Sequence, residues 1–353
     1  YRKSTRVGII GAGISGIAAA KQLSHHNPIV FEATDSIGGV WKHCSFASTK
    51  LQTPPCDFEF SDYPWPQRDN STFPSYLDIL HYLHAYATHF DVLKFVRFNS
   101  RVVEIRYIGG GDGRETTNLD VAAGPGEFGP ILSGHPVWEV AVETHPPKTI
   151  ERYGFELLVV CIGKYGDIPK MPVFPPNKGQ EVYGGKVMHT LDYSKLDKEA
   201  ARELLKGKKV AVVGYKKSAI DLATECAQAN QVSPSKAKPG AAQEFAFPSF
   251  VSCGYIESVS NLQTAELRCK WLSRLADGLF KLPSIKKMLD QTSEEIEIMK
   301  KTTRFYKRHC ISTFSINHSD EICEEMGWKC WRKNNWVLEA FAPYSSQDYG
   351  EED

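Results

Sequence analysis

The first thirty residues alternate between apolar segments and a glycine-rich turn. Residues 6–10 are almost continuously apolar, which predicts a short buried strand. The glycine-rich stretch 11–16 follows at once, and residues 17–23 have the composition of a helix. A second apolar strand is predicted at 29–32. This order of strand, turn, helix and strand is typical of a compact parallel βαβ unit.

The next hundred residues predict a covering loop and an antiparallel region. Residues 36–75 are dense in glycine, proline and aromatic side chains, which favours an ordered loop over a site. A helix with apolar positions three and four apart is predicted at 76–83. Residues 101–107 and 137–143 alternate like antiparallel strands, and residues 155–162 predict a further strand.

A second unit of the same kind is predicted in the middle of the chain. Residues 209–213 predict a strand, 214–219 a turn and 220–229 a helix. A further strand is expected next. The segment 233–240 has instead the composition of a linker, so the second unit is cut short.

The last third of the chain predicts helices. One begins at Asn261, and another is predicted to begin at Thr292, because Glu295 three residues later would complete a capping box. Gly327 is expected to end a third helix.

Length and charge narrow the class of protein. The 353 residues suggest two or three domains, and 42% hydrophobic with 24% charged residues is enough for a substantial core. Lysine plus arginine and aspartate plus glutamate are both 42, which disfavours a partner held by net charge, such as nucleic acid. No apolar run approaches the ~20 residues that span a bilayer, and the first residues do not resemble a signal peptide.

The nine cysteines are scattered, and none has Cys-x-x-Cys spacing. Their pattern therefore indicates neither a metal site nor a dithiol redox centre, and a reducing, cytoplasmic location is the simplest expectation. A flavin reductase or disulfide oxidoreductase, which needs a cysteine pair near its flavin, is disfavoured for the same reason.

The first glycine-rich turn has the spacing of a dinucleotide-binding site. Gly11 permits a tight turn, Gly13 allows the backbone to approach a pyrophosphate, and Gly16 allows close packing of helix on strand. Glu32, at the end of the next strand, can accept hydrogen bonds from a ribose and would repel a 2′-phosphate. FAD or NAD is therefore expected here. The paired glycines 38–39 with Trp41 suggest backbone lying against an extended cofactor.

The second turn keeps only part of this spacing. Gly214 and Ala219 stand at the first and last positions, and Lys216 replaces the middle glycine. Lys216 and Lys217 bring positive charge to the turn, which favours NADP as its ligand. The alternative is a vestigial nucleotide-binding fold that holds no ligand. No set of side chains for nucleophilic or paired-carboxylate catalysis stands out, so the chemistry is expected to belong to a cofactor. His189 alone is interpreted as a structural hydrogen-bonding residue.

Together these motifs resemble the plant flavin-containing monooxygenases. Residues 11–16 with Glu32 match the family's FAD fingerprint, and Tyr183–Tyr193 matches its identifying motif, with Tyr183 in place of Phe. Residues 160–163 resemble the family's Ala-Thr-Gly linker, and 214–219 resemble its NADPH turn. The resemblance covers nearly the whole chain.

The resemblance implies an α/β fold in which an FAD-binding Rossmann-like domain carries an inserted, incomplete NADPH-binding Rossmann-like domain. The expected boundaries are 1–165 for the first part of the FAD domain, 166–245 for the incomplete NADPH domain and 246–353 for the return to the FAD domain with C-terminal helices. The residues implied to bind the cofactors are Gly11, Ala12, Gly13, Ile14, Ser15, Gly16, Glu32, Gly39, Trp41 and Gly163, and in the second turn Gly214, Tyr215, Lys216, Lys217, Ser218 and Ala219.

The implied reaction uses NADPH to reduce the flavin and O₂ to form a flavin hydroperoxide, which oxygenates a soft nitrogen or sulfur of a small molecule. The family's active-site Asn is replaced by Gln52, judged from its spacing to Asp62, so Gln52 is the implied catalytic residue. The chain is shorter than family members, and the deficit is placed at 232–245. The alternative is therefore a truncated, inactive member that binds FAD only. In the family, the segment 253–255 and the helix from Asn261 close the flavin site, so both are expected to fold back onto the first domain.

Overall fold

The computed structural model describes residues 3–66, 71–108, 131–132, 134–146, 148–163, 165, 168–214, 217–230, 261–302, 315–342 and 344–350. One sheet of six strands forms its framework, in the order β3-β2-β1-β6-β5-β4. The strands are β1 (Lys3–Ile10), β2 (Ile29–Phe31), β3 (Val96–Arg97), β4 (Ser100–Tyr107), β5 (Trp138–Thr144) and β6 (Thr149–Val160). Strands β3, β2, β1 and β6 are parallel, and β5 and β4 continue the sheet antiparallel. The predicted mixed α/β class with a parallel core is confirmed.

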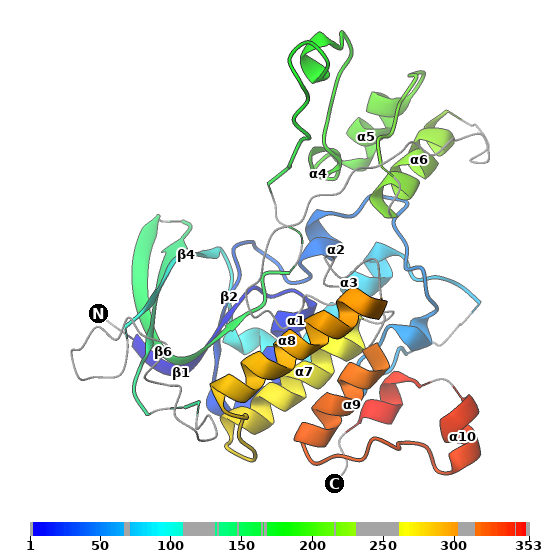
Figure 1. Ribbon diagram of the computed structural model, residues 1–353. Coiled ribbons are helices and arrows are strands. Elements are labelled where there is room, and N and C mark those ends of the chain that lie inside the picture. The colour runs from blue at the N-terminus through cyan, green and yellow to red at the C-terminus, as the bar shows by residue number, and fades with distance from the viewer. Residues whose placement is uncertain are drawn as a thin grey trace.

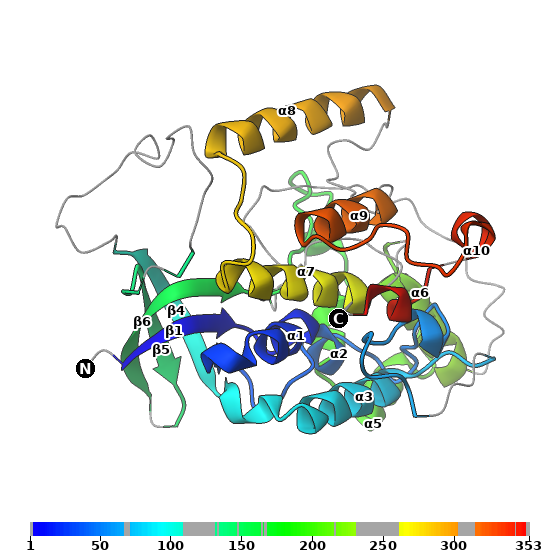
Figure 2. The same ribbon diagram turned by 90° about the horizontal axis from the view of Figure 1, so that it is seen from below.

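Helix α1 (Ile14–Gln22) packs between the sheet and the C-terminal helices. Its buried residues include Ala18, Ala19 and Ala20, whose small side chains let neighbouring elements approach closely. Helix α7 (Asn261–Ala276) runs beside α1 although some 240 residues separate them in the chain (Figure 2). Helix α3 (Tyr76–His89) also contacts α1 and begins with a capping box between Ser75 and Asp78.

The middle of the chain forms a projecting group of short helices. It contains α4 (Thr190–Tyr193), α5 (Lys198–Leu205) and α6 (Lys217–Ala229), which Figure 1 shows in green above the sheet-bearing part, near α2 (Val40–His43). Residues 209–213 form no strand in the described part of this group, so that prediction is wrong. Val213 is 85% exposed, because the described residues include no neighbouring strand that could pair with its backbone or cover its side chain.

Three further described helices follow α7 in the chain, and α9 packs against it. They are α8 (Ile285–Thr302), α9 (Ser315–Glu325) and α10 (Trp336–Phe341). Thr292 lies inside α8 and does not begin it, because the N–H of Lys287 is already capped by Ser284 one turn earlier in the chain. Gly327 follows α9 with φ +75°, as predicted for a helix end. Among the described helices, none combines the length and apolar character needed to cross a membrane.

Candidate functional site

The glycine turn between β1 and α1 has the geometry that its spacing predicts. Gly11 has φ +95°, and a Cβ there would lie 2.6 Å from the carbonyl oxygen of Cys161. Its N–H donates to the carbonyl of Phe31 at 2.8 Å. A Cβ at Gly16 would lie 1.8 Å from the carbonyl oxygen of Gly11. Both positions therefore require glycine so that the turn can fold and α1 can sit close to the strand.

Gly13 differs from the other two glycines. Its φ of −74° and ψ of −168° suit any residue, and among the described residues a Cβ there would meet only the Cα of Gly39, at 3.8 Å. Packing within the chain therefore does not explain a glycine at this position. The space that the missing side chain leaves beside the start of α1 is the space that a ligand approaching the backbone would use.

The carboxylate of Glu32 lies against this turn. It accepts hydrogen bonds from the N–H of Ala12 at 2.8 Å and from the N–H and hydroxyl of Thr34 at 2.9 and 2.8 Å. An ionised carboxylate has about four acceptor positions, and the Thr34 hydroxyl can rotate away. Glu32 is thus fixed in place and still able to accept from a ribose hydroxyl.

Two further loops reach the same edge of the sheet. The N–H of Gly38 donates to the carbonyl of Ala12 at 3.1 Å, and Gly39, with φ +55°, lies next to Gly13. Trp41 follows in α2 and packs edge-to-face on Phe58 at 5.8 Å between ring centroids.

Gly163, with φ +73°, comes three residues after the end of β6. The predicted FAD residues therefore gather at the carboxyl ends of β1, β2 and β6, where ligands bind in open parallel sheets.

The start of α1 fits a phosphate group. No side chain caps this helix, since its N-cap is Gly13. The first N–H groups of a helix have no partner within the helix and carry its positive dipole end. Ile14, Ser15 and Gly16 supply these groups at the turn. The residues present thus suit a dinucleotide with its pyrophosphate on α1 and a ribose at Glu32.

Gln52 is exposed in the loop that precedes α3. The adjacent Leu51 is held by a backbone hydrogen bond from its N–H to the carbonyl of Pro74 at 2.8 Å. No hydrogen bond in the described part of the chain joins the Gln52 side chain to the glycine turn. Its catalytic role stays a prediction.

The second turn is only partly described, since Tyr215 and Lys216 lie outside the described residues. Gly214 has φ +142°, and a Cβ there would lie 3.3 Å from the Cβ of Ala219, so turn and helix are close, as predicted. Ser218 is exposed. The Lys217 ammonium pairs with the carboxylate of Asp221 one turn along α6, which partly neutralises the positive charge proposed for a 2′-phosphate.

Helix α6 is hydrogen-bonded to the loop that follows α2. The N–H of Ser48 donates to Glu225 at 2.8 Å, and the hydroxyl of Thr49 donates to Asp221 at 3.2 Å. The hydroxyl of Tyr193 donates to Glu225 at 2.5 Å, and burial followed by this hydrogen bond raises the pKa of Tyr193. The projecting helices thus contact the sheet-bearing part through specific polar groups.

His189 has a structural role in this region. Its Nδ1 accepts a hydrogen bond from the N–H of Leu191 at 3.1 Å and so caps α4, in agreement with the interpretation from sequence.

Helix α7 folds back onto α1, as predicted for the C-terminal part. The buried hydroxyl of Ser273 donates to the carbonyl of Gln22 at 2.8 Å. Residues 253–255, predicted to fold back with it, lie outside the described residues.

Sequence reasoning missed a buried ion pair on α7. The carboxylate of Glu266 accepts from the N–H and hydroxyl of Ser61 at 2.7 and 2.8 Å and lies 3.6 Å from the ammonium of Lys270. Burial raises the pKa of Glu266, and the nearby Lys270 opposes this rise. The spacing of the pair by four residues on one helix is the only signal in the sequence.

A Gly-x-Gly-x-x-Gly turn at the carboxyl edge of a parallel sheet, with an acidic residue after the second strand, is typical of dinucleotide-binding α/β proteins. The sequence profile described as flavin-binding monooxygenase-like matches residues 4–124 and 243–334. The chain is 39% identical to the probable flavin-containing monooxygenase 1 of Arabidopsis thaliana, over 98% of this chain and 96% of that protein. It is 38% identical to the putative flavin-containing monooxygenase 2 of the same plant, over 92% and 98%. The chain belongs to the flavin-binding monooxygenase-like family.

The fold agrees with this assignment. The structure of S-allyl-L-cysteine S-oxygenase from Allium sativum matches 96% of this chain and 92% of its own, with a TM-score of 0.63 and 19% identity. The alignment with the first Arabidopsis relative runs over 515 residues, whereas this chain has 353, so at least 162 (515 minus 353) aligned positions face a gap here. The family profile leaves residues 125–242 unmatched, a stretch that includes the second turn.

Proposed function

We propose that this chain binds FAD noncovalently at the first glycine turn and oxygenates a small molecule at a soft nitrogen or sulfur, with NADPH as reductant and O₂ as oxidant. The observation that carries the FAD part is Gly13, whose glycine identity packing does not explain, beside the fixed carboxylate of Glu32. A bound flavin supplies the electron transfer and the reaction with O₂. The chain's own residues bind it, orient it and keep water from it.

The substrate class rests on membership of the family. A rabbit relative, 28% identical over 62% of this chain and 36% of its own length, is named dimethylaniline monooxygenase (N-oxide-forming) 4. Its name supports nitrogen oxygenation as one possibility, and sulfur, a comparably soft nucleophile, is the other. Gln52 is proposed as the amide that helps orient the reacting atoms, in place of the family's Asn.

A specific observation favours a second candidate, an FAD-binding chain that NADPH reduces poorly. The segment 209–213 forms no strand, and Val213 is 85% exposed. A dinucleotide site needs neighbouring strands beyond its glycine turn to shape the ribose pocket. Lys217 is moreover paired with Asp221. In this second candidate the second nucleotide unit is incomplete and binds NADPH weakly.

Anaerobic reduction separates the two candidates. The purified chain, loaded with FAD, is mixed with NADPH, and bleaching of the flavin absorbance is followed over time. Rapid bleaching that saturates at micromolar NADPH would establish that NADPH reduces the bound flavin, as the first candidate requires. A yellow protein that dithionite bleaches and NADPH does not would establish the second candidate. In that case, inserting the corresponding family segment at 232–245 should restore bleaching by NADPH.

A further inference from the structure

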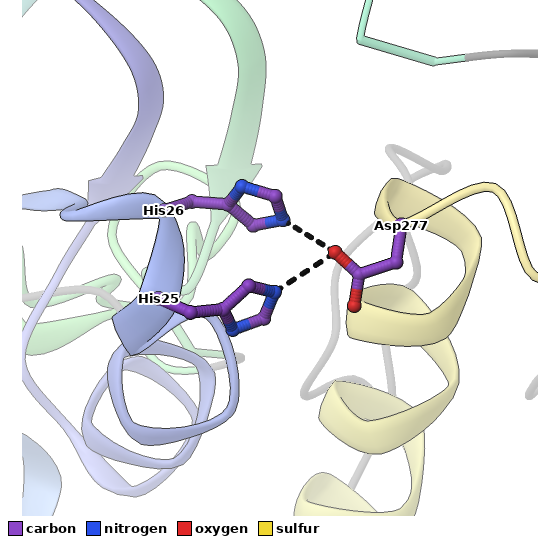
Figure 3. A group of neighbouring side chains, drawn as sticks. All are labelled: His25, His26 and Asp277. Carbon is purple, nitrogen blue, oxygen red and sulfur yellow. Dashed lines mark hydrogen bonds and ion pairs between the residues drawn. The ribbon is translucent and has the colours of Figure 1, made fainter.

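Two histidines and an aspartate meet at the surface between the C-terminal ends of α1 and α7 (Figure 3). His25 and His26 lie in the short 3₁₀ helix η1 (Ser24–His26), which follows α1. The Nε2 atoms of the two imidazoles lie 2.8 and 2.7 Å from the same oxygen, Oδ1 of Asp277. All three potential ligand atoms lie within 4.8 Å of one another. The cluster is at the opposite end of α1 from the glycine turn.

The backbone holds the two histidines in place before any ligand binds. The N–H of His26 donates to the carbonyl of Leu23 at 2.9 Å, and the N–H of Asn27 donates to that of Ser24 at 3.0 Å. Asn27 has φ +49°, which ends the turn. The side chain of His26 is 9% exposed, so its ring is packed on most sides.

The aspartate is fixed equally well at the end of α7. The N–H of Asp277 donates to the carbonyl of Ser273 at 2.9 Å. Gly278 follows with φ +70°, and the N–H of Leu279 returns to the carbonyl of Arg274 at 3.0 Å, which closes the helix end. The three potential metal ligands thus belong to two rigid backbone segments, one on each side of the contact between α1 and α7.

The position of Asp277 favours a cation. A carboxylate at the C-terminal end of a helix meets the negative end of the helix dipole, which is unfavourable by itself. The two imidazoles reduce this cost by donating hydrogen bonds from Nε2 to one carboxylate oxygen. A divalent cation among the three groups would compensate both the carboxylate and the helix end.

The donor set has the chemistry of zinc. Two imidazole nitrogens and one carboxylate oxygen are ligands that Zn²⁺ accepts, with a water molecule in the fourth position. Zinc–ligand distances of about 2.0–2.1 Å in a tetrahedron place donors about 3.3 Å apart. Each nitrogen would therefore move about 0.5 Å away from the carboxylate oxygen, the two nitrogens would take the same separation of about 3.3 Å from each other, and each ring proton would shift to Nδ1.

We propose that His25, His26 and Asp277 form a zinc site that fastens the C-terminal end of α7 to the end of α1. His25 and His26 lie 252 and 251 residues before Asp277 in the chain. The metal would therefore link the C-terminal part to the first βαβ unit. Because the bound metal stabilises only the folded state, the unfolding temperature rises with zinc concentration.

The test uses the full chain, treated with EDTA and then titrated with zinc chloride, with binding followed by calorimetry and stability by thermal unfolding. One zinc ion per chain is expected at this site. Since changes to the residues that merely orient metal ligands cost roughly 10–100-fold in affinity, His26→Gln and Asp277→Asn, which each remove a ligand, should weaken binding at least about tenfold and abolish the thermal shift. His81→Gln, which changes an exposed histidine on α3, is the matched control and should bind zinc like the unchanged chain.

Asp277→His separates a metal site from a simple hydrogen-bonded cluster. Three histidines are themselves a zinc set, so this variant should keep zinc binding although it loses the carboxylate. Cys56→Ser removes a partly exposed thiol elsewhere in the chain that could bind zinc on its own, and this variant should bind zinc like the unchanged chain. The proposal is overturned if the chain binds no zinc, or if His26→Gln and Asp277→Asn, folded by circular dichroism, bind zinc as tightly as the unchanged chain.

Discussion

Replacing Gly13 by serine tests whether glycine is required at this position for folding or for ligand binding. Gly13 is the N-cap of α1, its backbone is extended, and its Cβ would have only the Cα of Gly39 nearby, at 3.8 Å. Serine is among the best N-cap residues, whereas glycine is weaker there. The folded chain without ligand should therefore be unchanged in stability or gain about 0.2–0.5 kcal/mol.

The same substitution should interfere with FAD. The new side chain enters the space that the backbone leaves for the pyrophosphate, and its hydroxyl can occupy the first N–H groups of α1. Overpacking of this kind costs about 1–3 kcal/mol, which corresponds to roughly 5–150-fold weaker binding. The assay is the ratio of flavin absorbance to protein in purified samples, with thermal unfolding of the ligand-free chain measured alongside.

The control is Gly184→Ser, since a Cβ at Gly184 meets nothing within 4 Å and its φ is not positive. This variant should keep both stability and flavin. If Gly13→Ser retains as much flavin as the unchanged chain, Gly13 does not face the cofactor and the assignment of the site is refuted.

Three further predictions concern stability. Gly16→Ala should prevent correct folding, because its Cβ would lie 1.8 Å from a backbone oxygen, and soluble yield reports this. Lys270→Met leaves Glu266, 1% exposed, as an unpaired buried carboxylate, which should cost about 3–5 kcal/mol at pH 7.5 in denaturant unfolding. Val213→Ala should change stability by less than about 0.5 kcal/mol, whereas Val7→Ala, fully buried in β1, should cost about 2 kcal/mol.

The effect of Lys270→Met should depend on pH in a defined direction. Burial holds the pKa of Glu266 above its unfolded value, and Lys270 opposes this, so removing Lys270 raises the pKa further. A group with a raised folded pKa contributes less to stability as pH rises through that pKa. The loss of stability caused by Lys270→Met should therefore be smaller at pH 5 than at pH 7.5, and an equal loss at both pH values would contradict the assignment.

For Val213→Ala, a cost matching that of Val7→Ala would show that residues 209–213 are buried in a sheet after all.

The first βαβ unit could be predicted from sequence because its signals are local. Each signal depends only on residues close by in the sequence: the apolar run 6–10, the glycine spacing 11–16 and the acidic Glu32. The structure places them together. The antiparallel strands β4 and β5 were equally predictable from alternation. Local chemistry and final packing agree at these positions.

Other features depend on partners that sequence spacing does not reveal. The apolar run 209–213 has the composition of a strand and forms none, because a strand requires a neighbour to pair with. Thr292 and Glu295 have capping-box spacing, yet the preceding residues continue the helix through them. The meeting of His25 and His26 with Asp277 is set by the packing of α7 on α1, which links residues more than 250 positions apart.

The flavin content of the purified, folded chain is the most direct test of the account. The chain is incubated with FAD, passed through gel filtration, and its bound flavin is quantified after release by denaturation. The account predicts close to one FAD per chain, held noncovalently, and a lower flavin content in Gly13→Ser. A chain that is folded by circular dichroism and retains no flavin would contradict it.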